Sequence, residues 1–386
     1  MNTSRVSVTS EEHEEFRLVV RDFAQREIAP FAAQWDQDCR FPVEVVRKMG
    51  EIGLFGLIFP EEWGGGGGDF TSLCIAIEEL GRVDQSIGIT LSAGVGLGVN
   101  PIYVFGSDEQ RHQFLPDLVS GRALGAFALT EPDGGSDAGA TATRATHSDS
   151  MRTWRLNGSK SFITNSGTEI TSVITATART EDGGISAFLV PSGTPGLIVE
   201  PAYRKLGWHA SDTHGLTFAD CEIPEENLLG EPGQGFHNFL TMLDGGRIAI
   251  SALALGLAQT CLDLSIDYAK TRNAFGGPIG RFQSISFALA DLAVSVENSR
   301  NLTYKAAQLK DENKPFRKIA AMAKLYSTES AVEATRLATQ VFGGSGFMED
   351  SPVARFYRDA KILEIGEGTS EIQRLVIARS LGLPVG

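Results

Sequence analysis

At residues 154–164 the chain reads Trp154-Arg155-Leu156-Asn157-Gly158-Ser159-Lys160-Ser161-Phe162-Ile163-Thr164, and this stretch decides the fold class. Its centre is an Asn-Gly pair, which is the strongest short-range signal of a β-hairpin. Further runs of strand-forming residues follow at 173–178, 185–190, 197–199 and 216–218, with Pro and Gly in the gaps. The sequence therefore predicts a compact β-domain, a barrel or a sandwich, over residues 123–235.

Both flanks of this β-segment are predicted to be helical. In residues 1–122, Thr9-x-x-Glu12 fits a capping box, and apolar residues follow at helical spacing: Phe16, Val19, Val20 and Phe23. Further helices are expected at 42–49, 73–80 and 107–119. In residues 236–386, long amphipathic helices at 240–270, 282–310 and 316–340 favour an antiparallel four-helix bundle. The predicted fold class is α+β, with domains at 1–122, 123–235 and 236–386.

Composition narrows the class of protein. The 386 residues are 42% hydrophobic and carry a formal net charge of −14, which disfavours a nucleic-acid or anionic-membrane partner. The four cysteines are far apart, which argues against disulfides and a cysteine metal site and fits a reducing, cytoplasmic location. The N-terminus leads into acids, so no signal peptide is expected. The best apolar stretch, 248–258, is too short for a bilayer.

Two stretches of the chain are rich in glycine. The run Gly64–Gly68 could approach a phosphate, but such a run is more often a flexible loop. The stretch 343–346 follows a predicted helix and lacks the third glycine of a Rossmann fingerprint, so it does not indicate a dinucleotide-binding fold of that type.

A carboxylate stands between two glycines near the C-terminus, in Ile365-Gly366-Glu367-Gly368-Thr369-Ser370. Glycine permits backbone angles that other residues resist, so the chain can bend sharply there. Because Ser370-x-x-Gln373 fits a capping box, Glu367 is predicted on a turn just before a helix. It could serve as a catalytic base, or simply interact with the helix dipole.

Six motifs in the same order closely resemble those of the acyl-CoA dehydrogenase family. They are 129–137 (LTEPDGGSD), 157–165 (NGSKSFITN), 272–276 (Arg272-x-x-Phe275-Gly276), 340–346 (QVFGGSG), 358–361 (RDAK) and 366–370 (GEGTS). The resemblance covers essentially the whole chain. It implies an FAD enzyme that oxidises the Cα–Cβ bond of an acyl-CoA to a trans-2-enoyl-CoA. Such enzymes are usually homotetramers, dimers of dimers, that pass electrons to an electron-transfer flavoprotein.

The resemblance implies that Glu367 is the catalytic base that removes the α-proton, while the β-hydrogen leaves as hydride to flavin N5. Burial by the acyl chain and flavin would raise the pKa of Glu367 towards neutrality, which suits a general base. A related branch of the family carries its base on another helix, immediately before an arginine. Here that position is Gly246, before Arg247, which agrees with Glu367 as the base.

Site residues follow from the same motifs. The resemblance implies FAD contacts at Phe127, Leu129, Thr130, Ser136, Phe162, Ile163, Thr164, Thr369 and Glu371. It implies contacts to the FAD of a neighbouring subunit at Arg272, Phe275, Gln283, Gln340, Val341, Gly343 and Gly344. Substrate contacts are expected at Ser136, Asp244, Arg247 and Gly368. Phe127 and Phe162 could instead be core aromatics, and Arg247 could be a helix partner of Asp244.

The acyl group and the electron acceptor remain open at this point. Gly366 stands where straight-chain enzymes of the family often carry tyrosine, which hints at a branched, bulky or aromatic acyl group. Residues 83–88 contain no arginine, which argues against a dicarboxylyl substrate. The alternatives are an acyl-CoA oxidase that uses oxygen and a DNA-binding flavoprotein of the same fold, and the net charge counts against the second.

Overall fold

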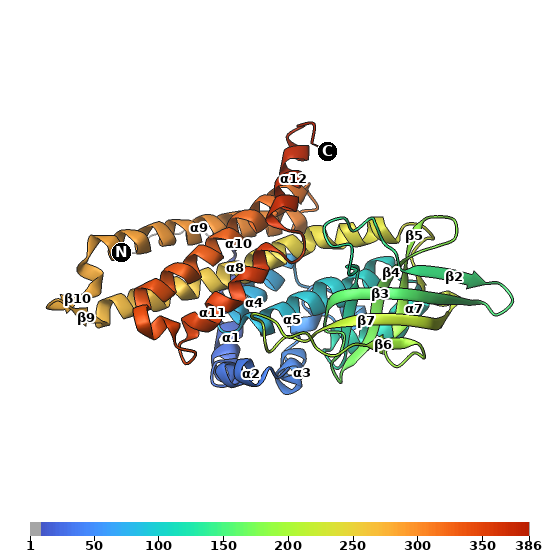
Figure 1. Ribbon diagram of the computed structural model, residues 1–386, viewed down its shortest axis with the longest axis horizontal. Helices are drawn as coiled ribbons and strands as arrows, with labels where there is room; N and C mark the ends of the chain where they lie inside the picture. The colour runs from blue at the N-terminus through green and yellow to red at the C-terminus, as the bar shows by residue number, and fades with distance from the viewer. Residues whose placement is uncertain (1–8, 386) are drawn as a thin grey trace.

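The computed structural model describes residues 9–385, and its N-terminal part is helical (Figure 1). The elements are α1 (Glu11–Phe23), η1 (Ala24–Ile28), α2 (Ala32–Asp38), α3 (Val43–Glu51), η2 (Leu54–Gly56), η3 (Glu61–Trp63), α4 (Phe70–Gly81), α5 (Gln85–Ala93), η4 (Gly94–Val99), α6 (Asn100–Phe105) and α7 (Asp108–Val119). Helix α4 is buried along almost its whole length, so this region packs around it.

The cap of α1 lies one residue beyond the predicted one. Ser10 is the N-cap, and its hydroxyl accepts from the His13 N–H, while the Thr9 hydroxyl donates to Glu14. The predicted box of Thr9 and Glu12 is therefore wrong, because Ser10 caps equally well and His13 completes the box from its third position. Val19, which is predicted on the apolar stripe, is 61% exposed.

The five-glycine run is a packed loop. The N–H groups of Gly66, Gly67 and Gly68 donate to the carbonyls of Gly56, Phe59 and Leu57 at 2.8–2.9 Å. A Cβ at Gly65 would lie 2.0 Å from the Phe59 carbonyl oxygen, so only glycine fits there. The phosphate-binding interpretation is wrong, because the backbone donors that it needs are already paired.

The middle of the chain forms one mixed eight-stranded sheet. Its strands are β1 (Leu124–Ala128), β2 (Arg144–Ser148), β3 (Thr153–Thr164), β4 (Thr171–Arg179), β5 (Ile185–Pro191), β6 (Leu197–Val199), β7 (Thr213–Pro224) and β8 (Leu228–Leu229), and η5 (Glu225–Asn227) precedes β8. The order is β6-β7-β3-β2-β4-β5-β8, with β1 parallel to β4. All four strand runs predicted after residue 165 are confirmed.

The Asn157-Gly158 pair does not make a hairpin turn, so that prediction is wrong. Residues 153–164 form one strand, and the hairpin turn lies at 149–152, between β2 and β3. Opposite Asn157 the partner strand β7 carries an extra residue, and the Asp220 N–H donates to Asn157 Oδ1 at 2.8 Å. A Cβ at Gly158 would lie 2.6 Å from Thr143 Cα. Asn157 therefore lies opposite a bulge in β7, and Gly158 allows the backbone to approach Thr143 closely. Both are known uses of glycine-containing pairs within a strand.

The C-terminal part is an antiparallel helical bundle (Figure 1). It contains α8 (Gly235–Thr271), η6 (Ile279–Arg281), α9 (Gln283–Asp311), α10 (Arg317–Phe342), η7 (Gly343–Phe347), α11 (Pro352–Ala360), η8 (Lys361–Glu364) and α12 (Ser370–Ser380). The short strands β9 (Asn273–Ala274) and β10 (Gly277–Pro278) join α8 to α9. Helix α4 packs against α8 and α9. The predicted α+β fold, with helical ends and a central sheet, is confirmed.

Two helical stretches, 85–105 and 235–271, are long and apolar enough to cross a membrane by length and composition. The expectation that no stretch is long enough is therefore wrong. Most of each stretch is buried inside the protein, as is usual for core helices of this length.

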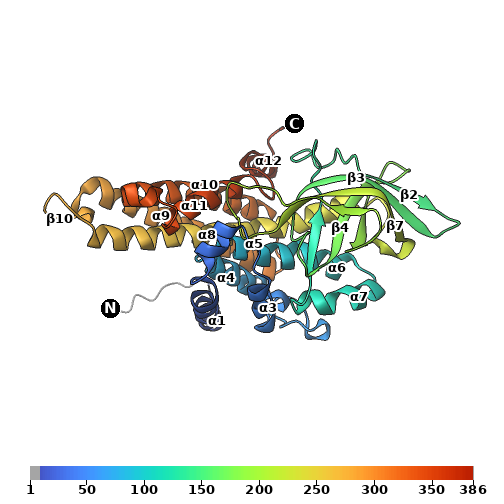
Figure 2. The same ribbon diagram turned by 60° about the horizontal axis from the view of Figure 1, so that its bottom comes forward.

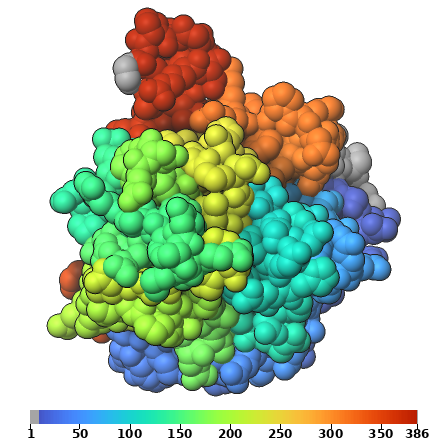
Figure 3. Space-filling view, turned by 90° about the vertical axis from the view of Figure 1, so that its right-hand side faces the viewer, coloured from blue at the N-terminus to red at the C-terminus, as the bar shows by residue number. Residues whose placement is uncertain are grey.

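The molecule is elongated, with the sheet at one end and the β9–β10 hairpin at the other (Figures 1 and 2). Viewed from the sheet end, α12 and the residues around it stand out from the body of the molecule (Figure 3). The turn that carries Glu367 lies between η8 and α12, and therefore near the middle of the long axis.

Candidate active site

Glu367 lies on a left-handed turn, as two successive positive φ angles show. The φ angle is +52° at Glu367 and +94° at Gly368. A non-glycine residue in this region costs about 1–2 kcal/mol, so neighbouring contacts must hold it. The Gly366 N–H donates to the Ile362 carbonyl at 2.8 Å, which anchors the start of the turn. The local sequence therefore provides the bend that was predicted.

The helix after this turn is capped one residue earlier than predicted. Thr369 is the N-cap of α12, and its hydroxyl accepts from the Ile372 N–H at 3.3 Å. The Ser370–Gln373 box is therefore wrong. The Gln373 amide instead donates to the Gly368 carbonyl at 2.8 Å. Threonine caps helices nearly as well as serine, so the adjacent pair could not be separated from the sequence.

The Glu367 carboxylate is held away from water. The residue as a whole is partly exposed, but its Oε2 atom is fully buried and has no hydrogen-bond partner within residues 9–385. Burial raises the pKa of Glu367 from 4.5 to about 7, against the attraction of Lys324 and Arg247, which lowers it. A carboxylate that has one buried, unpaired oxygen and a pKa near neutrality is well suited to take up a proton.

Helix α8 passes directly beside this carboxylate at Gly246. A Cβ built on Gly246 would lie 2.0 Å from Glu367 Oε2, far inside van der Waals contact. Any side chain at this position would displace the carboxylate. The observed position of the Glu367 carboxylate therefore requires glycine at position 246.

Asp244 and Arg247 lie on the same helix, next to the carboxylate. Arg247 is buried and its Nη1 pairs with Asp244, as the helix-partner interpretation expects. Arg317 also approaches Asp244, at 3.4 Å. Burial lowers the pKa of Arg247, while Asp244 and Glu367 raise it. The pair is positioned at the site, and its contact with substrate stays a prediction.

Lys324 on α10 was not identified from the sequence. Its side chain is fully buried, and its Nζ donates to the Gly368 carbonyl at 2.8 Å. Burial lowers the pKa of Lys324 to about 8, against the attraction of Glu367 and Glu364. The available signal was a lysine among small residues, Ala320, Ala321 and Ala323, in a helix that is buried on that face.

The predicted cofactor contacts from the middle domain lie in two neighbouring segments. The Ser161 N–H donates to the Thr130 carbonyl at 2.8 Å, which joins residues 127–136 to residues 162–164. Phe127 stacks on Phe239 with ring centres 3.9 Å apart, whereas Phe162 is 65% exposed. Ser136 is exposed. The side chains of Leu129 and Ile163 are buried in the core, so only their backbone can face a ligand.

The predicted contacts from the bundle lie at the other end of the molecule. Phe275 lies in the turn of the β9–β10 hairpin, with Arg272 before the hairpin and Gln283 after it. Residues 340–344 join them at the end of α10, where Phe342 stacks on Tyr268 at 4.2 Å. Phe275 is 90% exposed, while the Val341 side chain is buried. One chain does not bring these residues to the middle-domain group (Figures 1 and 2). Thr369 and Glu371 lie beside Glu367 at the start of α12.

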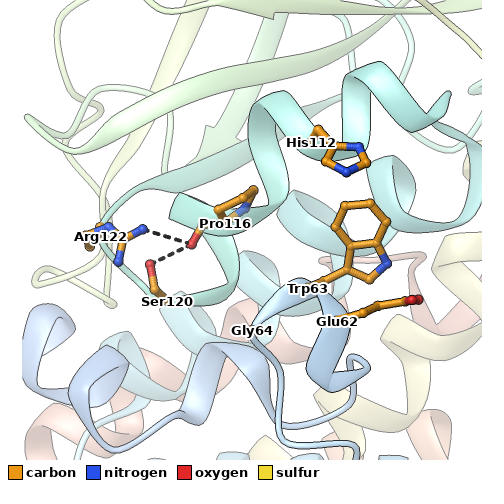
Figure 4. Close-up of a pocket in the computed structure, with 7 residues that line it drawn as sticks. All are labelled: Glu62, Trp63, Gly64, His112, Pro116, Ser120 and Arg122. Carbon is orange, nitrogen blue, oxygen red and sulfur yellow. Dashed lines mark hydrogen bonds between the residues drawn. The ribbon is translucent and has the colours of Figure 1, made fainter.

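A cavity of about 490 Å³ lies away from these residues, between η3 and α7 (Figure 4). It is lined by Glu62, Trp63, Gly64, His112, Pro116, Ser120 and Arg122. The Trp63 and His112 rings meet edge to face at 4.9 Å. None of the predicted site residues lines this cavity. Within residues 9–385, no three metal-binding side chains cluster.

Comparison with known proteins places the whole chain in one family. Models of the acyl-CoA dehydrogenase N-terminal, middle and C-terminal domains match residues 10–122, 126–221 and 233–382. A probable acyl-CoA dehydrogenase, YngJ of Bacillus subtilis (strain 168), is 50% identical over 96% of this chain and 98% of its own length. The mitochondrial short-chain specific acyl-CoA dehydrogenase of Mus musculus is 48% identical over 96% and 90%.

A solved structure of similar sequence supports the same grouping. Butyryl-CoA dehydrogenase from Megasphaera elsdenii is 42% identical and superposes with a TM-score of 0.93, covering 99% of this chain and 100% of its own. The resemblance seen in the six motifs is thereby confirmed, and with it the family's use of FAD. The chain belongs to the acyl-CoA dehydrogenase family.

Proposed function

We propose that this protein dehydrogenates short-chain acyl-CoA thioesters to trans-2-enoyl-CoAs, with Glu367 as the base. The observation that carries the proposal is the Glu367 carboxylate, whose Oε2 atom is buried and unpaired and whose pKa is raised by burial to about 7. The short-chain preference is supported by the substrates named for the mouse and Megasphaera relatives.

The residues of this chain fit FAD. Phe162 and Phe275 are large, exposed aromatic side chains with positive φ, which suits contact with a flat ring system. At Gly343 and Gly344 an added Cβ would meet no atom within 4 Å, so the backbone there is open to a ligand. Arg272 is exposed beside them and can bind a pyrophosphate through its planar guanidinium. When bound, FAD supplies the acceptor for the hydride from Cβ.

The role of Glu367 follows from its surroundings. The substrate α-proton moves to the Glu367 carboxylate, which accepts it readily because burial favours the protonated form. Lys324 and Arg247 counter this effect, so the carboxylate is still ionised at mildly alkaline pH and can act as a base. Gly246 leaves the space that the carboxylate occupies. The Glu367 N–H, beside the carboxylate, is proposed to bind the thioester oxygen and stabilise the enolate.

The two sets of residues predicted to contact FAD lie far apart in one chain, and this separation is relevant to how the chains form an oligomer. Because Arg272, Phe275 and Gln283 lie far from Thr130 and Phe162, they are proposed to contact the FAD of a second copy of the chain. This supports the proposed dimer of dimers. Electron-transfer flavoprotein as the electron acceptor and a cytoplasmic location are part of the same proposal.

The test is anaerobic bleaching of the flavin-loaded protein by a panel of acyl-CoAs. Butyryl-CoA should bleach it rapidly, and octanoyl-CoA slowly. The panel includes isobutyryl- and isovaleryl-CoA, because a Cβ at Gly366 would meet nothing closer than 3.5 Å and the turn leaves room there. Glu367→Gln should retain FAD and lose at least about 10³-fold in rate, which is within the range for loss of a general base.

Each result of this panel discriminates between functions. Rapid bleaching by Glu367→Gln would refute the assignment of the base. If the branched acyl-CoAs bleach the flavin faster than butyryl-CoA does, the protein prefers branched over straight-chain substrates. If oxygen is then admitted to the bleached protein, rapid reoxidation with stoichiometric peroxide would indicate an acyl-CoA oxidase instead.

A further inference from the structure

Lys324 is a fully buried ammonium group with a specific partner. It lies on α10, and its Nζ donates to the Gly368 carbonyl at 2.8 Å. A buried charge without partners is costly, so a lysine at this position needs a compensating role. Gln373 from α12 donates to the same carbonyl, also at 2.8 Å. Two helices therefore converge on one oxygen atom of the catalytic turn.

This carbonyl belongs to the strained part of the turn. Glu367 and Gly368 both have positive φ, and an unfavourable backbone conformation of this kind persists only when the surroundings enforce it. The donors on the Gly368 carbonyl fix the peptide that follows the two left-handed residues. A Cβ at Gly368 would lie 2.8 Å from the Gln373 amide nitrogen, so the contact is also tightly packed.

Lys324 differs from Gln373 because it also brings a positive charge. The charged groups that act on Lys324 are Glu367 from the turn, Glu364 from η8, Arg247 from α8 and Glu329 from α10 itself. Those that act on Glu367 are Lys324 and Arg247. Since Arg247 is already paired with Asp244, Lys324 is the cation near Glu367 that has no carboxylate partner of its own within 4 Å in residues 9–385.

We propose that Lys324 is a positioning residue for Glu367: its ammonium group holds the Gly368 carbonyl, so that the left-handed turn presents the carboxylate, and its charge keeps that carboxylate ionised. The inference rests on the proposed role of Glu367 as the base. Lys324 thus supplies both a hydrogen bond to the Gly368 carbonyl and a positive charge near Glu367, whereas Gln373 supplies only the hydrogen bond. Substitutions at the two positions can therefore separate the effect of the charge from that of the hydrogen bond.

Three variants isolate the charge from the hydrogen bond. Lys324→Gln keeps a donor but removes the charge, Lys324→Arg keeps both, and Gln373→Leu removes a donor from the same carbonyl without changing any charge. Each is loaded with FAD, checked for flavin content and thermal unfolding, and assayed by anaerobic flavin reduction with butyryl-CoA from pH 5.5 to 9. Ionisation of Glu367 is followed separately by infrared difference titration of its carboxyl band, with Glu367→Gln as the blank.

The expected result is a shift of the acidic limb of the curve of flavin-reduction rate against pH. In the parent protein the rate should rise with pH through a midpoint near 7, as Glu367 ionises. In Lys324→Gln both the kinetic midpoint and the infrared midpoint should rise by about one pH unit, because an opposite charge has been removed. Gln373→Leu should lower the limiting rate and leave both midpoints unchanged. Lys324→Arg should restore the midpoint of the parent protein.

Unchanged midpoints in a flavin-loaded Lys324→Gln would overturn the inference. The same is true if Gln373→Leu moves the midpoint as far as Lys324→Gln does, since a structural change alone would then account for it. If Lys324→Gln does not fold, Lys324→Arg decides: an altered infrared midpoint in that variant contradicts the inference. Failure of the proposed function is recognised independently, by rapid turnover of Glu367→Gln.

Discussion

Replacing Gly246 with alanine tests the contact between α8 and the proposed base most directly. A Cβ at this position would lie 2.0 Å from Glu367 Oε2, whereas carbon atoms in proteins essentially never come closer than 3.0 Å to such an atom. The carboxylate must therefore retreat by about 1 Å. A misplacement of about 1 Å can lower a catalysed rate by about 100-fold, equivalent to about 2.7 kcal/mol of activation free energy.

The adjacent glycine provides a matched control. At Gly245 a Cβ would meet nothing closer than 3.7 Å, which is ordinary van der Waals contact. Both glycines lie inside α8, so both alanine variants gain about 1 kcal/mol of helix propensity. The difference between the two variants therefore reports the contact with Glu367 alone.

The assay is the limiting rate of anaerobic flavin reduction at pH 8.5, with flavin content and unfolding temperature measured on the same samples. Gly245→Ala should reduce the flavin within about threefold of the parent rate, and Gly246→Ala about 100-fold more slowly. If Gly246→Ala reacts as fast as Gly245→Ala, the carboxylate does not occupy the position described, and the reasoning about the site is refuted.

Three further predictions concern stability. Glu78→Gln should destabilise the protein by about 3–5 kcal/mol in urea unfolding, because it removes the buried negative charge that Arg17 contacts at 2.8 Å and Arg300 at 2.7 Å, while Arg17 keeps Glu79 as a close carboxylate. Burial raises the pKa of Asp359 to about 7, so the protonated form is favoured in the fold and stability falls as pH rises from about 4 to 7. Asp359→Asn should therefore lose less stability than the parent between pH 5.5 and 8, and an equal loss would contradict this. Gly158→Ala should lower the unfolding midpoint by an amount equivalent to about 1–3 kcal/mol, because its Cβ would lie 2.6 Å from Thr143 Cα, and an unchanged midpoint would show that the bulge tolerates a side chain.

The sequence predicted correctly those helices and strands whose position depends on a local pattern of residues. Helical spacing located the three long bundle helices, and runs of strand-forming residues located β4 and β5, because each pattern reflects burial along a single element. The hairpin at Asn157-Gly158 failed because the same dipeptide also suits a bulge, and only the partner strand distinguishes the two.

The candidate site shows more clearly that local sequence patterns do not reveal contacts between distant parts of the chain. Glu367 could be singled out because its two glycine neighbours are adjacent in the chain. Lys324 could not, because its partner carbonyl lies 44 residues away and nothing near Lys324 in the sequence refers to it. The order of motifs along a chain contains no distances, so the separation of Phe275 from Phe162 could be expected only from the family resemblance, which assigns Phe275 to the FAD of a neighbouring subunit.

The burial of α8 has a consequence for how the protein is made. This 37-residue helix is apolar enough to cross a membrane by length and composition. Much of its cover comes from α4, which precedes it by more than 150 residues, and from α9 and α10, which follow it. A ribosome therefore releases α8 before α9 and α10 exist to cover it. Exposed apolar surface of this kind promotes aggregation during synthesis. We expect the newly made chain to depend on chaperones until α10 is complete, and truncation after α8 to yield insoluble protein even though the central sheet is whole.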